Sequence, residues 1–215
     1  MENPRLTFAT PTIIAGDRSL VSLIAHELAH SWSGNLVTNA TWNDFWLNEG
    51  FTVYFERRIM EALYGKDYTD MLALLGFQDL TSEISSLDED MQKLKLKLNG
   101  LHPDDAMSDI AYEKGYFFLR MLEEKKGRAK MDSFLKNYFD DHKFQTITTE
   151  EFLAYLDKNL LQGEEDGLMI NQWVYQSGLP ANCPKVLSNR FVQAEKAVDV
   201  FLKKGVDNIV DAAAD

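Results

Sequence analysis

The sequence contains very little cysteine and no long apolar run. Its single cysteine, Cys183, excludes a disulfide within the chain, and we interpret this residue as small, half-buried and chemically silent. No apolar stretch approaches the ~20 residues that a membrane-spanning helix needs. Residues 1–12 are mixed in character and show no signal peptide. These absences predict a cytoplasmic location.

Basic residues are also scarce. Lysine and arginine number 22 against 34 aspartates and glutamates, which gives a formal net charge of −12. Nucleic acids and anionic membranes are bound through basic patches, so we predict neither as a partner. With 45% hydrophobic and 26% charged residues, the composition is that of a globular protein with a substantial core. The length of 215 residues suits one large domain or two small ones.

The most informative feature that is present is a short motif. Residues 26–30 read His-Glu-Leu-Ala-His, and Glu49 follows after a gap of 18 residues. Positions i and i+4 of a helix share a face, so His26 and His30 can bind one ion. Catalytic zinc takes three protein ligands and keeps a fourth position open, and Glu49 can be the third ligand. Glu27 lies about 100° round the helix from His26, so it can act as a general base without binding the metal.

The alternative is a solvated cluster on a surface helix. It does not explain why ionisable residues interrupt such an apolar segment, nor why Glu49 lies among the aromatic residues of 45–55, where an unpaired carboxylate would be costly. We therefore predict one Zn²⁺ per chain. The helix should also present a core face of apolar residues at helical spacing: Leu20, Leu23, Ile24, Leu28 and Trp32.

These residues resemble the gluzincin pattern of zinc aminopeptidases. Further similar motifs are Met-Glu-Asn-Pro at 1–4, Gly-Asn-Leu-Val-Thr at 34–38, Trp-Leu-Asn-Glu-Gly-Phe at 46–51 and Tyr-Glu-Lys-Gly at 112–115. Their order resembles the aminopeptidase N and leukotriene hydrolase group, and most closely its leukotriene hydrolase/aminopeptidase branch. The resemblance implies a mainly α, thermolysin-like metallopeptidase catalytic domain with one or two short strands. It also implies a zinc cofactor and a peptide substrate with a free N-terminus.

The same resemblance implies roles for two more residues. Tyr112 matches the family's catalytic tyrosine, whose phenol can donate a hydrogen bond to an oxyanion; the alternative is a tyrosine packed among neighbouring aromatic residues. Glu2 matches the carboxylate that recognises the substrate's α-ammonium group; the alternative is an ordinary surface glutamate. Asp44 and Glu56 are candidates to hold the second ring nitrogens of the metal-binding histidines, with a surface ion pair as the alternative for Glu56.

We interpret the chain as a zinc-dependent aminopeptidase that hydrolyses the N-terminal peptide bond of peptides with metal-activated water. The alternatives are a non-catalytic or incomplete fragment of such an enzyme, a leukotriene-type epoxide hydrolase and a zinc endopeptidase. Met107 disfavours the epoxide hydrolase, because the leukotriene-type branch has a tyrosine five residues before the catalytic one.

The chain opens within the Met-Glu-Asn motif, so the resemblance implies a catalytic-domain fragment. We expect residues 1–185 to form the zinc aminopeptidase catalytic domain, without its N-terminal part. Residues 186–215 should form a helical tail or linker towards a missing C-terminal domain. The missing N- and C-terminal domains of the parent enzyme would then be partners of this chain.

Hydrophobic periodicity and turn residues predict a mostly helical chain. A short strand is expected near 7–10, and the strict Lys-Leu alternation of 93–98 predicts a half-buried strand. The expected helices cover residues 19–33, 43–64, 67–86, 108–126, 130–142, 148–156, 168–176 and 188–213.

Overall fold

The computed structural model describes residues 3–164 and 167–204, and it confirms the prediction of a mainly α fold with short strands. The single-turn and π-helical segments are labelled η. The elements follow in this order: η1 (Pro11–Ile13), α1 (Val21–Ala29), β1 (Val37–Asn39), η2 (Trp42–Asp44), α2 (Trp46–Tyr64), α3 (Lys66–Ser86), η3 (Glu89–Gln92), η4 (Pro103–Ala106), η5 (Ile110–Lys114), α4 (Gly115–Lys126), α5 (Arg128–Asp141), β2 (Gln145–Ile147), α6 (Thr149–Leu156), η6 (Asp157–Leu161), α7 (Ile170–Tyr175) and α8 (Asn189–Lys204).

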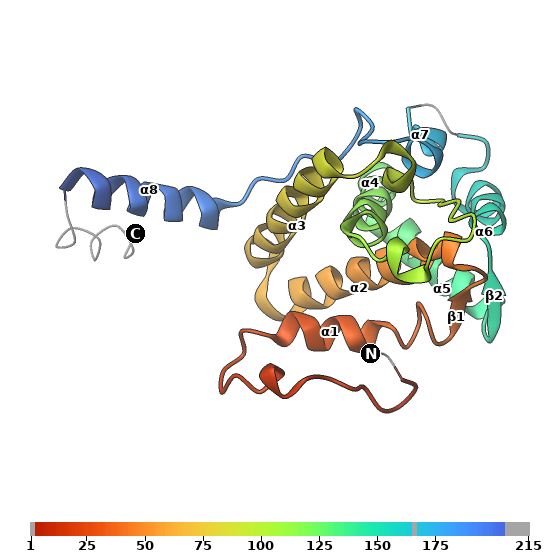
Figure 1. Ribbon diagram of the computed structural model, residues 1–215, viewed down its shortest axis with the longest axis horizontal. Coiled ribbons are helices and arrows are strands. Elements are labelled where there is room, and N and C mark those ends of the chain that lie inside the picture. The colour runs from red at the N-terminus through yellow and green to blue at the C-terminus, as the bar shows by residue number, and fades with distance from the viewer. Residues whose placement is uncertain (1–2, 165–166, 205–215) are drawn as a thin grey trace.

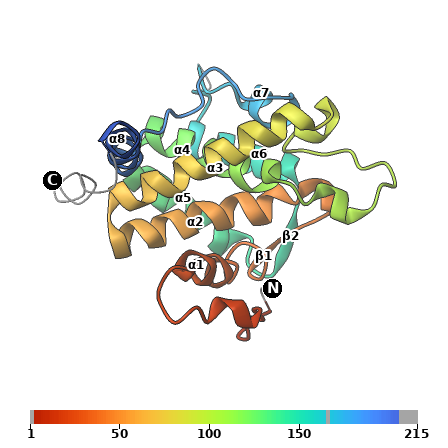
Figure 2. The same cartoon turned by 60° about the vertical axis from the view of Figure 1, so that its left-hand side comes forward.

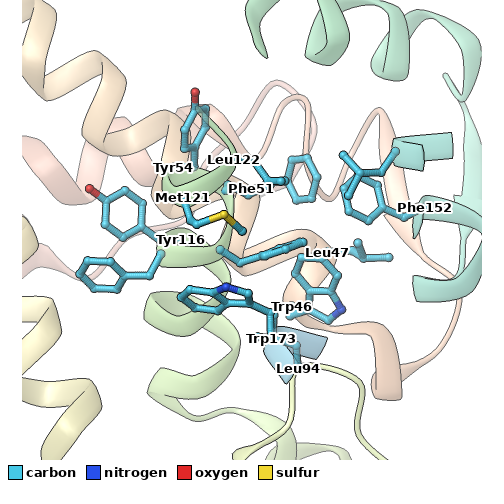
Figure 3. Packing of buried hydrophobic residues seen from close by; sticks show 14 of the residues in the cluster. Trp46, Leu47, Phe51, Tyr54, Leu94, Tyr116, Met121, Leu122, Phe152 and Trp173 are labelled. Carbon is cyan, nitrogen blue, oxygen red and sulfur yellow. The ribbon is translucent and has the colours of Figure 1, made fainter. Parts of the chain in front are cut away.

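Helix α2 is the central element of the fold. Figure 2 shows α1 along one side of it and α3 along the other. Its first turns are buried, and Figure 3 shows Trp46 and Phe51 of α2 converging with Phe152 of α6 and Trp173 of α7. Aromatic side chains bury large apolar areas, so this cluster is a major source of stability. The helix ends at Gly65, whose φ of 81° favours glycine.

Two glycines allow α2 to approach the start of α4. A Cβ on Gly50 would lie 2.8 Å from the Cα of Gly115, and a Cβ on Gly115 would lie 2.8 Å from the Cα of Gly50. Backbone atoms cannot move aside as a flexible side chain can, so neither position has room for a larger residue. This contact holds η5, the π-helix directly before α4, against α2.

The two strands form a parallel pair that closes one end of the helical body. Val37 of β1 is opposite Gln145 of β2, and Asn39 is opposite Ile147. The pair ties the segment after α1 to the start of α6, which begins with a capping box at Thr148. The strand expected at 7–10 is wrong, since that segment has no strand and leads into η1.

The strand predicted at 93–98 is also wrong, although the burial of its residues alternates as expected. Leu94, Leu96 and Leu98 are buried, and the lysines between them are more exposed. The backbone, however, pairs with no strand. Instead Leu96 donates its N–H to the carbonyl of Asn43, and Leu98 donates to the Oδ1 of the same residue. The alternation of the sequence therefore indicated which side chains are buried. The hydrogen bonds that a neighbouring strand would have made are made by Asn43 instead.

The core face predicted for α1 is wrong as well. The five apolar residues assigned to it are 37–55% exposed. The helix turns its opposite face to α2, where Ala25 and Ala29 are buried and leave room for close packing. Small residues at the contact let the two helices approach, and this approach brings the histidines of α1 against α2. The exposed apolar residues are Leu20, Leu23, Ile24, Leu28 and Trp32.

Helix α8 lies beyond the helical body and contacts it at α3 (Figure 1). The guanidinium of Arg190 lies over the ring of Tyr68, 5.2 Å from its centroid. The prediction extended this helix to residue 213, and residues 205–215 lie outside the described part of the chain. Among the described helices, none combines the length and apolarity needed to cross a bilayer.

Candidate metal centre

Helices α1 and α2 bring the three predicted metal ligands together. His26 lies on α1, His30 directly follows the helix, and Glu49 lies in the first turn of α2. The Nε2 atoms of His26 and His30 lie 3.3 and 3.5 Å from Oε2 of Glu49. One nitrogen or oxygen atom of each of the three residues lies within 4.8 Å of the others. His30 and Glu49 are buried, and His26 is half-buried.

The Nδ1 atoms of both histidines also have hydrogen-bond partners. Nδ1 of His26 lies 3.2 Å from Oε2 of Glu56, as expected for a residue two turns after Glu49 on α2. Nδ1 of His30 lies 2.8 Å from the backbone carbonyl of Ser33. A carbonyl only accepts hydrogen bonds, so Nδ1 of His30 donates to Ser33 and Nε2 is the ring nitrogen that faces Glu49. These contacts fix both rings with Nε2 towards Glu49.

This arrangement fits a bound cation. Oε2 of Glu49 is buried and lacks a well-aligned hydrogen bond among the described residues. It lies 3.3 Å from Nε2 of His26 and 3.5 Å from Nε2 of His30. A buried carboxylate is costly unless positive charge compensates it, and a proton or a metal cation held by these rings would supply that charge. Two imidazoles and one carboxylate are a ligand set that zinc takes at catalytic sites.

The site also attracts a proton. Burial opposes a charge on the ring of His26, but hydrogen bonds and the charges of Glu49 and Glu56 outweigh it and raise the pKa of His26 to about 9. Neighbouring carboxylates therefore stabilise positive charge at this position. The same groups would stabilise a metal cation.

Two of the other predicted site residues lie close to the ligands. Glu27 is half-buried on α1, directly after His26. The ring of Tyr112, in η5, stacks on the ring of His26 with centroids 6.1 Å apart and planes 20° apart. Tyr112 also meets the edge of Phe45, which directly precedes α2. The predicted residue Glu2 lies outside the described residues.

Two residues that were not predicted from the sequence support the candidate ligands. Thr52 places its Oγ1 3.1 Å from Nδ1 of His30 and 2.6 Å from Oγ of Ser33. Both residues follow a ligand by three positions, Ser33 after His30 and Thr52 after Glu49. On a helix this spacing puts Thr52 on the same face as Glu49, so the sequence contained a signal that Thr52 lies near the candidate ligands.

Asp44, a candidate partner of the histidines, has a different place in the structure. Its buried carboxylate accepts a 2.8 Å hydrogen bond from the backbone N–H of Thr149 and a 2.6 Å bond from Oγ1 of Thr41. It also pairs with Nζ of Lys95 at 2.6 Å. Asp44 therefore ties the start of α2 to the start of α6 and to the extended segment 93–98.

We expect Asp44→Asn to lower the free energy of unfolding at pH 7 by about 1.5–3 kcal/mol, since it removes charge-assisted hydrogen bonds while Lys95 keeps its 3.1 Å contact with Glu150. Burial raises the pKa of Asp44, but hydrogen bonds from Lys95, Thr41 and Thr149 outweigh it and lower the pKa below 3.8. A carboxyl whose pKa is lowered by folding stabilises the protein above its unfolded pKa, and this contribution is lost as the pH falls through the folded value.

Urea unfolding at several pH values tests this expectation. The difference in the free energy of unfolding between Asp44→Asn and the wild type should stay constant from pH 7 to about pH 5. It should become smaller below about pH 4. Asp88→Asn, an exposed position, is the control and should change stability by less than about 0.5 kcal/mol. A difference that grows on acidification would contradict the assigned contacts.

Comparison with known proteins places this site in a family. The chain matches the peptidase family M1 domain over residues 1–173. Leucine aminopeptidase 2 of Neosartorya fischeri is 46% identical over 187 residues, which cover 84% of this chain and 30% of the relative. A leukotriene A-4 hydrolase homolog of Botryotinia fuckeliana is 45% identical over 188 residues, with 84% and 29% covered.

Solved structures agree with this result. The chain superimposes on yeast LTA4 hydrolase in complex with Bestatin with a TM-score of 0.84 and 42% identity, over 93% of this chain and 32% of that one. An M1 zinc metallopeptidase mutant of Deinococcus radiodurans, bound to a Tyr-Ser-Ala substrate, gives a TM-score of 0.61 at 27% identity, with 77% and 35% covered. These neighbours confirm the predicted thermolysin-like metallopeptidase fold.

The chain spans about a third of the length of these relatives. Within that length, the family match begins at residue 1 and includes both helices of the metal centre and the π-helix that carries Tyr112. Because the match covers well over half of the sequence, the chain belongs to peptidase family M1.

Proposed function

We propose that this chain is the zinc-binding part of an aminopeptidase. The observation that carries the proposal is the convergence of three possible ligand atoms, in which Nε2 of His26, Nε2 of His30 and Oε2 of Glu49 face one another. These three residues would hold one Zn²⁺. Leucine aminopeptidase 2 and zinc metallopeptidases among the relatives support this choice of metal and reaction.

When bound, zinc polarises a peptide carbonyl and acidifies water. The proton chemistry falls to Glu27, which accepts a proton from the attacking water and later delivers it to the leaving amine. Tyr112 donates its phenolic hydrogen to the carbonyl oxygen as negative charge develops there. The stacking of Tyr112 on His26 supports this role, because it places the tyrosine beside the metal ligands.

Selection for the end of a peptide is assigned to Glu2. A carboxylate near the metal would pair with the free α-ammonium group of the substrate through charge-assisted hydrogen bonds. This role rests on the sequence motif and on relatives named as aminopeptidases. We further propose that other substrate contacts come from parts of the enzyme outside this sequence, since the relatives are about three times as long.

Epoxide hydrolysis is the weaker candidate. Some relatives are named LTA4 hydrolase or its homolog. In this chain the position five residues before Tyr112 is Met107, which is 55% exposed. A thioether has no acidic hydrogen to donate, so it cannot protonate or orient an epoxide oxygen as a phenol can.

Peptides that differ only at their amino terminus test the proposal. We expect the zinc-loaded chain to release the first residue from a short peptide with a free amine and to leave the N-acetylated peptide intact. A chelator should abolish the cleavage. Equal cleavage of both peptides would indicate an endopeptidase instead, and turnover of a lipid epoxide without peptide cleavage would favour the rival activity.

A further inference from the structure

A closed ring of contacts joins the metal centre to Tyr112. Oε2 of Glu56 lies 3.2 Å from Nδ1 of His26, and Oε1 of the same carboxylate pairs with Nη1 of Arg57 at 2.6 Å. Nη2 of Arg57 pairs with Oε1 of Glu113 at 2.8 Å. Glu113 directly follows Tyr112, and the tyrosine ring stacks back on His26. The ring therefore passes through α1, α2 and η5.

The pair of Arg57 and Glu113 is deeply buried. The side chain of Arg57 is 9% exposed and that of Glu113 is 11% exposed. Burial raises the pKa of Glu113, and the guanidinium of Arg57 opposes this rise. Nε of Arg57 and Oε2 of Glu113 have no hydrogen-bond partner among the described residues. A buried pair with unsatisfied atoms is a poor source of stability, so its presence calls for another explanation.

The surrounding backbone makes room for this pair. A Cβ on Gly76 of α3 would lie 2.3 Å from the carboxyl carbon of Glu113, so only glycine admits the carboxylate there. Two residues after Glu113, the close contact of Gly115 with Gly50 holds the end of η5 against α2. The carboxylate of Glu113 is thus enclosed between α2 and α3, and it has little freedom to move.

Three successive residues of η5 point to three different anchors. Tyr112 meets His26, Glu113 meets Arg57, and Lys114 donates from Nζ to the carbonyls of Gln92 (2.7 Å) and Gln176 (2.8 Å). Single π-helical turns are frequently found at functional sites. Here the turn lets the tyrosine face the metal ligands while its neighbours fix the backbone.

We propose that Arg57 and Glu113 are positioning residues that hold Tyr112 over the metal-binding histidine. They act through the backbone of η5 and through Glu56, and they touch neither metal nor substrate. The catalytic consequence rests on the role proposed above for Tyr112. The position of the tyrosine ring does not depend on that role, because it can be measured without any catalysis.

Fluorine NMR tests the position of the ring directly. The chain contains 8 tyrosines, and incorporation of 3-fluorotyrosine would give each a resonance. The Tyr112 signal is the one missing from Tyr112→Phe. We expect Glu113→Ala to move this signal towards that of free 3-fluorotyrosine and to remove its response to added Zn²⁺. An unchanged Tyr112 signal in folded Glu113→Ala would overturn the proposal.

Glu123→Ala is the matched control. Glu123 also pairs with arginines, Arg58 and Arg128, and its side chain is 15% exposed, but it lies on α4 outside the ring of contacts. Its loss should leave the Tyr112 signal in place. If Glu113→Ala does not fold, Arg57→Lys replaces it, because lysine keeps the charge but cannot bridge two carboxylates as a guanidinium does. The Tyr112 signal must then move in Arg57→Lys, and a fixed signal counts against the proposal.

Kinetics separate this inference from the proposed function. If the wild-type chain cleaves peptides, Glu113→Ala should lower kcat about 10- to 100-fold with KM and zinc content unchanged, since misplacement of a catalytic group by ~1 Å has an effect of this size. A raised KM at constant kcat would contradict positioning. If the wild-type chain cleaves nothing, the proposed function fails for this chain, and the fluorine signal alone decides where Tyr112 is held.

Discussion

Replacement of His30 by alanine is expected to remove stoichiometric zinc from this chain. The wild type should retain about one zinc per chain after dialysis, because three ligands suffice for a catalytic site. His30 would supply one of them from a buried ring whose Nδ1 is fixed by Ser33. Loss of a residue that merely orients a ligand weakens metal binding about 10- to 100-fold, so loss of the ligand itself should weaken it more.

Elemental analysis of the purified proteins measures this effect. His102→Ala is the control, because the side chain of His102 is 72% exposed and lies outside the metal centre. It should retain zinc as the wild type does. Zinc that persists at full stoichiometry in His30→Ala would show that the ion binds elsewhere. A wild-type chain without zinc would contradict the metal assignment altogether.

Replacement of Glu27 by glutamine is expected to lower kcat about 10²- to 10⁴-fold, the range that a general base contributes. An amide keeps the size of the side chain but cannot accept the proton. Zinc content should not change, since Glu27 is not among the residues whose ligand atoms converge. The defect should therefore appear in the chemical step and not in metal binding.

Single-turnover cleavage of a peptide with a free amine measures this defect. Glu89→Gln, an exposed position in η3, is the matched control and should retain full activity. An unchanged kcat in Glu27→Gln would remove Glu27 from the mechanism. A loss of zinc together with activity would instead assign Glu27 to the structure of the metal centre.

The local pattern of the sequence predicted the metal centre because its parts are close in the chain. Helical spacing alone puts His26 and His30 on one face, and the seven-residue step from Glu49 put Glu56 on the same side of α2. The structure brings these four residues together, while their chemical roles stay predictions. The helix expected at 148–156 matches α6 for the same local reason.

The errors have one common cause, which is that periodicity reports apolar positions and not their partners. The alternation at 93–98 predicted a strand, yet Asn43 supplies the hydrogen bonds that a neighbouring strand would give. The apolar stripe of α1 predicted a core face, yet α1 packs on α2 through Ala25 and Ala29. Neither partner can be read from the segment itself.

The sequence by itself thus determined the helical class, the candidate ligands on α1 and α2 and the family motifs. Only the tertiary structure decided that Tyr112 stacks on His26 and that Arg57 reaches Glu113 across 56 residues of sequence. Such contacts depend on how closely α2 and η5 approach, and this approach is set by two glycines that have no side chain to reveal their partner. Local physics fixes which face a residue occupies, whereas packing fixes what that face meets.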